Sequence, residues 1–205
     1  RAAGPGIRGR GGRLSEATRA AAAERIVDVL LALDPLTDLP RTGFVLRGVA
    51  GPESIAAHCF GVALTTMLLV DALRAEGVAL DGERALRMAL VHDAAEAATG
   101  DVPMPVKTPA LEAALEDAER VLADRLLPPA QAEAWREVEV GETLEARVVK
   151  AADKIQMMTK VLAYGRQGRG DLCEFWANEA NFRDRDVPLA TAVFDVLRAR
   201  HEARA

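Results

Sequence analysis

The sequence has little of what marks several protein classes. Aromatic residues make up only 4% of its 205 residues, and no segment alternates convincingly between apolar and polar residues, which argues against a β-sheet. Hydrophobic residues make up 50% of the chain, and alanine and leucine dominate among them. Because both residues favour helices, we predict an all-α fold.

A broad positive charge and a disulfide framework are also missing. The formal net charge is -5, which argues against duplex nucleic acid as the main partner. Only two cysteines occur, so we expect the protein to be located in the reducing cytoplasm. We interpret Cys59 as a core residue and not as a metal ligand, although it follows His58 directly. We find no apolar run long enough to span a bilayer and no signal-like opening segment, and therefore expect no membrane partner.

The chain divides into a short tail and one domain. Residues 1–13 are basic and rich in glycine, which predicts a disordered tail, with a nucleic-acid or phosphate-binding arm as the alternative. Residues 14–205 are predicted to form a single helical domain. Caps, prolines and apolar periodicity predict helices at about 15–33, 55–77, 83–98, 109–127, 129–135, 142–164, 171–181 and 188–203, with an irregular segment at 36–51.

The predicted helix at 83–98 combines apolar and ionisable residues in an unusual way. Between Met88 and Ala98 every residue is apolar except His92, Asp93 and Glu96. A helix that is apolar on nearly all sides is expected to be buried, at the centre of the bundle. Since buried carboxylates are costly unless they are paired or bind a metal, this helix predicts a metal centre.

Two residues from other predicted helices complete the candidate centre. Alone, His58 is interpreted as a core histidine, and Asp153 as a surface charge paired with a lysine such as Lys150. Together with His92 and Asp93, they form a set of two imidazoles and two carboxylates. Such a set suits one divalent ion, namely Mn, Co, Fe, Ni, Zn or Mg, with open positions left for water and substrate.

Five short stretches carry a specific pattern around these residues. They are Leu-Pro-Arg-Thr-Gly-Phe-Val from residue 39, Pro-Glu-Ser-Ile-Ala-Ala-His from residue 52, Ala-Leu-Val-His-Asp-Ala-Ala-Glu-Ala-Ala-Thr-Gly-Asp from residue 89, Pro-Val-Lys from residue 105 and Ala-Ala-Asp-Lys from residue 151. Over about residues 39–165 the chain resembles the HD-domain phosphohydrolases, and most of all their 5'-deoxynucleotidase branch. The resemblance implies that the two histidines and two aspartates are the metal ligands.

The resemblance also implies a reaction, the hydrolysis of a nucleoside 5'-monophosphate by a homodimeric enzyme. Glu96 resembles the catalytic carboxylate that orients or deprotonates the attacking water, and Asp101 resembles an acid near the sugar and the phosphate. Which of the two acts as the base stays open. Residues 111–127 form an amphipathic stretch that could supply the dimer contact.

Three residues are implied to bind the substrate. Arg41 resembles a phosphate-binding arginine, a role that suits its fixed fork of donors. Lys107 either adds positive charge at the edge of the same phosphate-binding site or is an ordinary surface lysine. Thr42 stands where the well-known bacterial deoxynucleotidases carry a tryptophan against the sugar, so a modified or biosynthetic nucleotide is an alternative substrate. Glu53 and Ser54 are interpreted as supports that place His58.

Other classes of protein with a similar core fit less well. Di-iron oxygenases need extra histidine ligands, and only His201 remains in this chain. Guanosine-tetraphosphate hydrolases carry an acidic pair after the His-Asp segment, whereas here Glu96 is followed by Ala97. The alternatives that stay open are a non-catalytic metal- or nucleotide-binding HD-domain protein and a hydrolase of another phosphorylated nucleotide.

Overall fold

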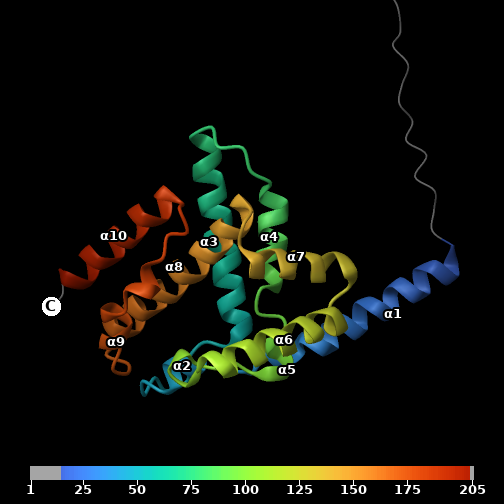
Figure 1. The fold of residues 1–205 in the computed structure, drawn as a ribbon, viewed down its shortest axis with the longest axis horizontal. Helices are drawn as coiled ribbons and strands as arrows, with labels where there is room; N and C mark the ends of the chain where they lie inside the picture. The colour runs from blue at the N-terminus through green and yellow to red at the C-terminus, as the bar shows by residue number, and fades with distance from the viewer. Residues whose placement is uncertain (1–14, 204–205) are drawn as a thin grey trace, which may run out of the picture.

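A computed structural model describes residues 15–203 of the chain (Figure 1). Its helices are α1 (Glu16–Leu33), η1 (Asp34–Thr37), α2 (Thr42–Val45), α3 (Ile55–Ala75), α4 (Gly82–Val91), α5 (Glu96–Thr99), η2 (Met104–Val106), α6 (Pro109–Leu126), α7 (Pro129–Val140), α8 (Leu144–Arg166), α9 (Cys173–Ala177), η3 (Glu179–Phe182) and α10 (Pro188–Glu202). The described residues contain no β-strand, only an isolated bridge between Pro40 and Ser54, and the all-α prediction is confirmed. The tail predicted at 1–13 lies outside the described residues.

Several of the longer helices begin where a short polar side chain caps them. Ser15, Ser54, Asp81 and Thr108 each accept a hydrogen bond from the backbone N–H three residues later. Each bond satisfies one of the donors that a helix leaves free in its first turn. Because these bonds are local, the sequence predicts these starts well.

The core lies where α3 and α8 pack against each other. Helix α4 contacts both of them, α7 lies against α4 and α8, and α10 covers another side of α8 (Figure 1). Val62, Met88, Met158 and Val161 are fully buried in this region. Burying one such side chain stabilises the fold by roughly 1.5–3 kcal/mol. The α3–α8 pair is therefore the rigid frame on which the candidate site is built.

Helix α3 departs from the expectation that no apolar run could span a bilayer. Its 21 residues are long and apolar enough to cross a membrane by length and composition alone. One side of the helix packs on α4 and α8, while Phe60 and Leu68 on the other side are exposed. Core helices of water-soluble proteins pass the same length and composition test.

The helix predicted at 83–98 is interrupted, so the prediction that one helix continues through this segment is wrong. Helix α4 ends at Val91, residues 92–95 form a turn, and α5 starts at Glu96. The His92 ring bonds the Ala89 carbonyl at 2.9 Å through Nδ1. In a continuing α-helix the Asp93 amide would use that carbonyl, so the side chain competes with the next helical bond. Leu90 is also 60% exposed, so α4 is buried on one side only.

Smaller differences concern the connecting segments. The segment 36–51, predicted as irregular, contains the second half of η1 and all of α2. The helix predicted at 171–181 is split into α9 and η3, because the Asn178 side chain accepts from the Ala180 amide and starts a new turn. Of these short elements, α2 meets Asp101 through Thr42, and Phe175 of α9 stacks on Phe44 of α2.

Candidate metal centre

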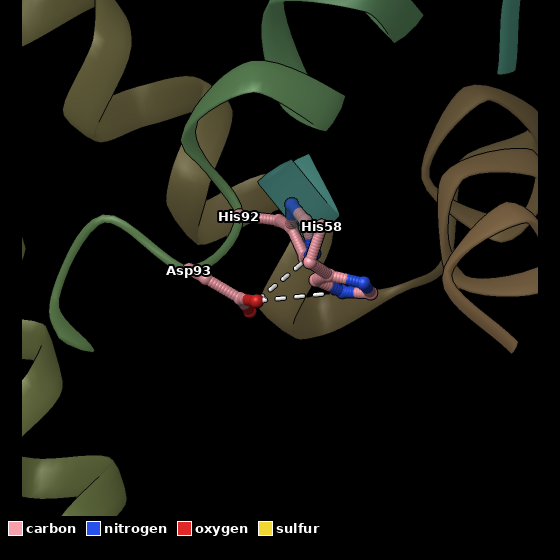
Figure 2. A group of neighbouring side chains, drawn as sticks. All are labelled: His58, His92 and Asp93. Carbon is pink, nitrogen blue, oxygen red and sulfur yellow. Dashed lines mark ion pairs between the residues drawn. The ribbon is translucent and has the colours of Figure 1, made fainter. Parts of the chain in front are cut away.

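His58, His92 and Asp93 meet between the first turn of α3 and the end of α4 (Figure 2). The Asp93 Oδ2 atom lies 3.6 Å from His58 Nε2 and 3.3 Å from His92 Nε2. Their potential ligand atoms all lie within 4.8 Å of one another. The structure therefore brings together three of the four residues predicted as ligands in one tight group, a candidate metal site.

Both imidazole rings turn the same nitrogen toward this group. His58 Nδ1 lies 2.6 Å from the Oε1 atom of Gln156, and His92 Nδ1 lies 2.9 Å from the Ala89 carbonyl oxygen. Each Nδ1 therefore carries the proton, which leaves a lone pair on each Nε2. Both Nε2 atoms are buried and have no hydrogen-bond partner among the described residues. Two buried, unpartnered lone pairs beside a carboxylate fit a divalent cation.

The spacing of the group fits the same ion. Ligand atoms at about 2.1 Å from a zinc-sized ion lie roughly 3.0–3.4 Å apart, depending on the geometry of the shell. The measured separations of 3.3 and 3.6 Å around Asp93 Oδ2 are close to this range.

Asp153, on α8, reaches the site from the side of His58. Its Oδ1 atom lies 3.2 Å from His58 Nε2, but it is not part of the tight group of three. The lysine beside its other oxygen is Lys154, at 3.4 Å, and not the Lys150 that we considered. Asp153 is thus placed to become a fourth ligand, and the four-ligand shell stays a prediction.

The pKa values of Asp153 and His92 are shifted by the charges of their neighbours. Burial opposes ionisation of Asp153, but Lys154 and His58 hold the pKa of its carboxyl well below the usual range. Burial likewise disfavours a charged His92, yet Asp93, Cys59 and Asp153 together outweigh it and raise the pKa of the imidazole. Without a metal, the surrounding negative charge therefore attracts a second proton to the Nε2 lone pair of His92. A divalent cation supplies that positive charge instead and displaces the proton.

Glu96 lies beside the group because the turn after α4 leads directly into α5. Burial, and then the charge of Asp93, raise the pKa of Glu96 to about 9. Its Oε2 atom is buried without a partner among the described residues. The carboxyl group is thus free to exchange a proton with a molecule bound at the site.

Asp101 is engaged differently from Glu96. Gly100 ends α5 with a φ of 73°, a backbone conformation that favours glycine, and the chain then turns so that Asp101 faces α2. The Oδ2 atom of Asp101 accepts from the Thr42 amide at 2.5 Å. Asp101 therefore holds the start of α2, which follows Arg41 directly.

Arg41 is held at the site by its own backbone. The Arg41 amide donates to the Glu53 carbonyl at 3.0 Å, and the Ile55 amide donates to the Leu39 carbonyl at 2.9 Å. The Arg41 Nη1 atom lies 3.4 Å from Asp93 Oδ2. Burial opposes the charge of the guanidinium, but Asp93, Asp101 and other acids outweigh it and raise its pKa. A fixed positive fork therefore lies next to the metal ligands.

Lys107 makes no hydrogen bond or ion pair with this group among the described residues. It follows η2 directly, and its positive charge acts on Glu119 of α6, where burial raises the pKa of the glutamate and Lys107 lowers it. Its role at the phosphate stays a prediction. The histidine outside the site, His201, stacks on Trp176 at 4.0 Å between ring centroids and is not part of the metal-ligating group.

Sequence reasoning missed Gln156. It is 9% exposed and contacts both His58 and Glu53 from α8. The signal was a polar residue among the apolar Ile155, Met157 and Met158, three positions after a candidate ligand. That spacing places two residues on the same helix face.

The helical fold and this site define a class, in which helices gather histidine and aspartate side chains around a divalent ion. The sequence pattern of the HD-domain family matches residues 33–190, and the chain belongs to this family. It is 34% identical over 171 residues to the 5'-deoxynucleotidase hdd1 of Schizosaccharomyces pombe, covering 75% of this chain and 81% of that protein. It is 31% identical over 185 residues to the 5'-deoxynucleotidase HDDC2 of Xenopus laevis, covering 85% and 88%. The PH0347 protein of Pyrococcus horikoshii OT3 has a similar structure, with a TM-score of 0.73, 36% identity, and coverage of 85% of this chain and 97% of that one.

Proposed function

We propose that this protein is a metal-dependent phosphohydrolase that removes the 5'-phosphate from deoxynucleoside monophosphates, with one divalent ion per chain. The observation that carries the proposal is the pair of buried, unpartnered Nε2 atoms of His58 and His92, which meet Asp93 next to the guanidinium of Arg41. A metal centre beside a fixed positive fork suits a phosphate monoester. The names of the relatives support a nucleotide as the substrate.

We assign separate roles in hydrolysis to Arg41, Glu96 and Asp101. When bound, the ion polarises a phosphoryl oxygen and lowers the pKa of a water molecule. Arg41 binds the phosphate oxygens and balances their charge. In the ionised form, which the positive charge of a bound ion would favour, Glu96 would take the proton of the attacking water at its Oε2 atom, which has no other described partner. Asp101 acts through its bond to the Thr42 amide and keeps α2 and Arg41 in place.

The sugar that the site accepts is the least determined part of this proposal. Thr42 is the first residue of α2 and is small, so it leaves more room than a large aromatic side chain would. A modified or biosynthetic nucleotide is therefore an alternative substrate. Ribonucleotides, deoxynucleotides and modified nucleotides must be compared directly.

A phosphate-release screen tests the function. Nucleoside mono-, di- and triphosphates, in ribo and deoxy forms, are each assayed with Mn, Co, Fe, Ni, Zn and Mg. We expect release from 5'-monophosphates that requires metal and is lost in Asp93→Ala. Metal and nucleotide binding without phosphate release would instead support a non-catalytic binding protein, and release only from di- or triphosphates would support another hydrolase of the family.

The assembly and location stay proposals as well. We propose a cytoplasmic homodimer that has neither a membrane nor duplex nucleic acid as its partner. The exposed Leu111 and Val121 of α6, and the exposed Leu30 and Leu31 of α1, offer apolar surface for a second copy. Light scattering coupled to size-exclusion chromatography tests the dimer: a monomer at all concentrations would contradict it.

A further inference from the structure

We propose that Gln156 is a positioning residue that fixes the tautomer and the direction of the His58 ring, and that Gly61 leaves the space it needs. The inference rests on the metal centre proposed above and concerns how the chain prepares one of its ligands. Gln156 lies on α8, three residues after Asp153 and on the same helix face. Among the described residues its side chain forms hydrogen bonds with His58 and Glu53, so we expect its influence on the centre to pass through His58.

The hydrogen bonds around Gln156 have one consistent direction. Its Nε2 atom donates to Glu53 Oε2 at 3.0 Å, and the same carboxylate oxygen lies 3.2 Å from the Nζ atom of Lys160. An ionised carboxylate accepts only, so the amide must turn its NH₂ end toward Glu53. Its carbonyl end then faces His58 and accepts the Nδ1–H at 2.6 Å. The lone pair of His58 is thereby assigned to Nε2, on the side of Asp93.

The same face of α8 anchors the chain just before His58. Lys160 follows Gln156 by four residues, and Tyr164 follows Lys160 by four, so the three share a face. The hydroxyl oxygen of Tyr164 accepts from the Glu53 amide at 2.8 Å. Glu53 is thus held through both its backbone and its side chain, and it keeps the direction of the Gln156 amide fixed.

Gly61 lies on α3, one turn after His58, and faces the Gln156 side chain. A Cβ atom at this glycine would lie 2.8 Å from Gln156 Cγ and 2.9 Å from its Nε2, closer than real Cβ contacts. Gly61 is not among the glycines with positive φ, so the requirement is for space and not for an unusual backbone. A methyl group there would displace the Nε2 atom that binds Glu53, and with it the carbonyl that orients His58.

The test measures how tightly the metal-free protein binds Co²⁺ alone, by competition with a chelator. Gln156→Leu keeps a similar volume but removes both hydrogen bonds, and it is expected to weaken Co²⁺ binding by about 10- to 100-fold. Gly61→Ala is expected to weaken binding in the same direction. Gly165→Ala on α8 is the matched control and is expected to bind like the wild type, because a Cβ there meets no atom within 4 Å.

Two double variants separate positioning from ordinary packing. Gln156→Ala removes the side chain that Gly61→Ala would strike, so adding Gly61→Ala to Gln156→Ala is expected to cause no further loss of affinity. The exchange of Glu53→Gln together with Gln156→Glu keeps an acceptor for His58 Nδ1–H and a hydrogen bond between the two residues. It is expected to bind Co²⁺ more tightly than Gln156→Leu, and it provides the test if that leucine variant does not fold.

The outcomes distinguish this inference from the metal centre itself. A wild-type protein that does not bind Co²⁺ would overturn both. Wild-type binding with unchanged affinity in Gln156→Leu and Gly61→Ala would overturn the positioning role alone. A Gly61→Ala loss that persists in the Gln156→Ala background would also overturn it, because the loss would then arise from packing and not from the displaced amide.

Discussion

The two halves of the proposed metal centre are built in different ways. His58 and Asp153 lie inside the long helices α3 and α8, and side chains of α8 hold the His58 ring. His92 and Asp93 lie where α4 ends, and a backbone carbonyl holds the His92 ring. One half thus draws its order from helix packing, and the other from the end of a helix.

The break after α4 lets the side chains of His92 and Asp93 point to the same place, which a continuous helix would hinder. Neighbouring residues of an α-helix point about 100° apart, so an adjacent histidine and aspartate do not converge easily on one ion. The turn at residues 92–95 brings His92 Nε2 to 3.3 Å from Asp93 Oδ2. It also carries Glu96 to the same site on a new helix. Breaking the helix therefore places the proposed ligand pair and Glu96, the proposed proton acceptor, together.

Removing the shared oxygen should have the largest effect, because Asp93 joins the two halves. Asp93→Ala is expected to lose metal affinity by more than about 100-fold, beyond the loss typical of a residue that only supports a ligand. Turnover should be lost with the metal. Metal analysis and phosphate release on one preparation check this, and a variant that retains its full metal content would contradict the assignment.

The proton acceptor can be separated from the metal ligands by Glu96→Gln. The change keeps the size of the side chain, so metal content should stay at the wild-type level while turnover falls about 10²–10⁴-fold. Glu142→Gln, at an exposed glutamate, is the control and should keep wild-type turnover. Near-normal turnover in Glu96→Gln would show that another residue takes the proton.

The contrast between the buried and exposed sides of α4 gives a test of stability. Met88 is fully buried, whereas Leu90, two residues later, is 60% exposed. Met88→Ala is expected to reduce the free energy of unfolding by about 2–5 kcal/mol, and Leu90→Ala by no more than about 0.5 kcal/mol. Urea unfolding of the two metal-free variants measures both. Equal reductions of the free energy of unfolding in the two variants would mean that α4 is buried on all sides, as the sequence first indicated.

The substrate side of the centre depends on the shape of Arg41 as well as its charge. Arg41→Lys keeps a positive charge beside Asp93 but loses the planar fork that grips two phosphate oxygens. We expect kcat/KM to fall about 10- to 100-fold, which corresponds to the loss of one charge-assisted contact. Metal content should not change. Wild-type kinetics on nucleoside monophosphates would remove Arg41 from phosphate binding.

The raised pKa of Glu96 also predicts how the stability of the metal-free protein depends on pH. In the unfolded chain a glutamate titrates near 4.3, whereas the folded pKa is about 9. Between these values only the folded state keeps the proton, so stability present below about pH 4.3 is lost as pH rises toward 9, by at most about 1.4 kcal/mol per unit. His92 contributes in both proteins, so the difference between the wild type and Glu96→Gln isolates Glu96. Urea unfolding at several pH values should show a shallower slope in Glu96→Gln, and equal slopes would contradict the raised pKa.

What the sequence predicted well depends on short-range chemistry. Caps such as Ser54 and Asp81 act within three residues, and apolar spacing marks α8 without any knowledge of its neighbours. The meeting of His58 with His92 and Asp93 also agrees with the prediction of a centre assembled from separate helices. These features need only local propensity and the rule that buried charges require partners.

What the sequence did not predict depends on choices between competing bonds. Residues 92–98 are rich in alanine and favour a helix, yet the His92 ring takes the carbonyl that would continue it. The contact of Gln156 with His58 joins residues 98 apart in the chain, and Thr42 meets Asp101 across 59. Neither pairing has a periodic signal, because each is fixed only once the helices have packed.

The central claim is that the two differently built halves hold one ion between them. Anomalous scattering from crystals of the protein loaded with Co²⁺ tests it most directly. The account predicts a single peak per chain, within bonding distance of His58 Nε2, His92 Nε2 and a carboxylate oxygen of Asp93, with Asp153 completing the shell. Two peaks, or no peak at this group after loading, would contradict it.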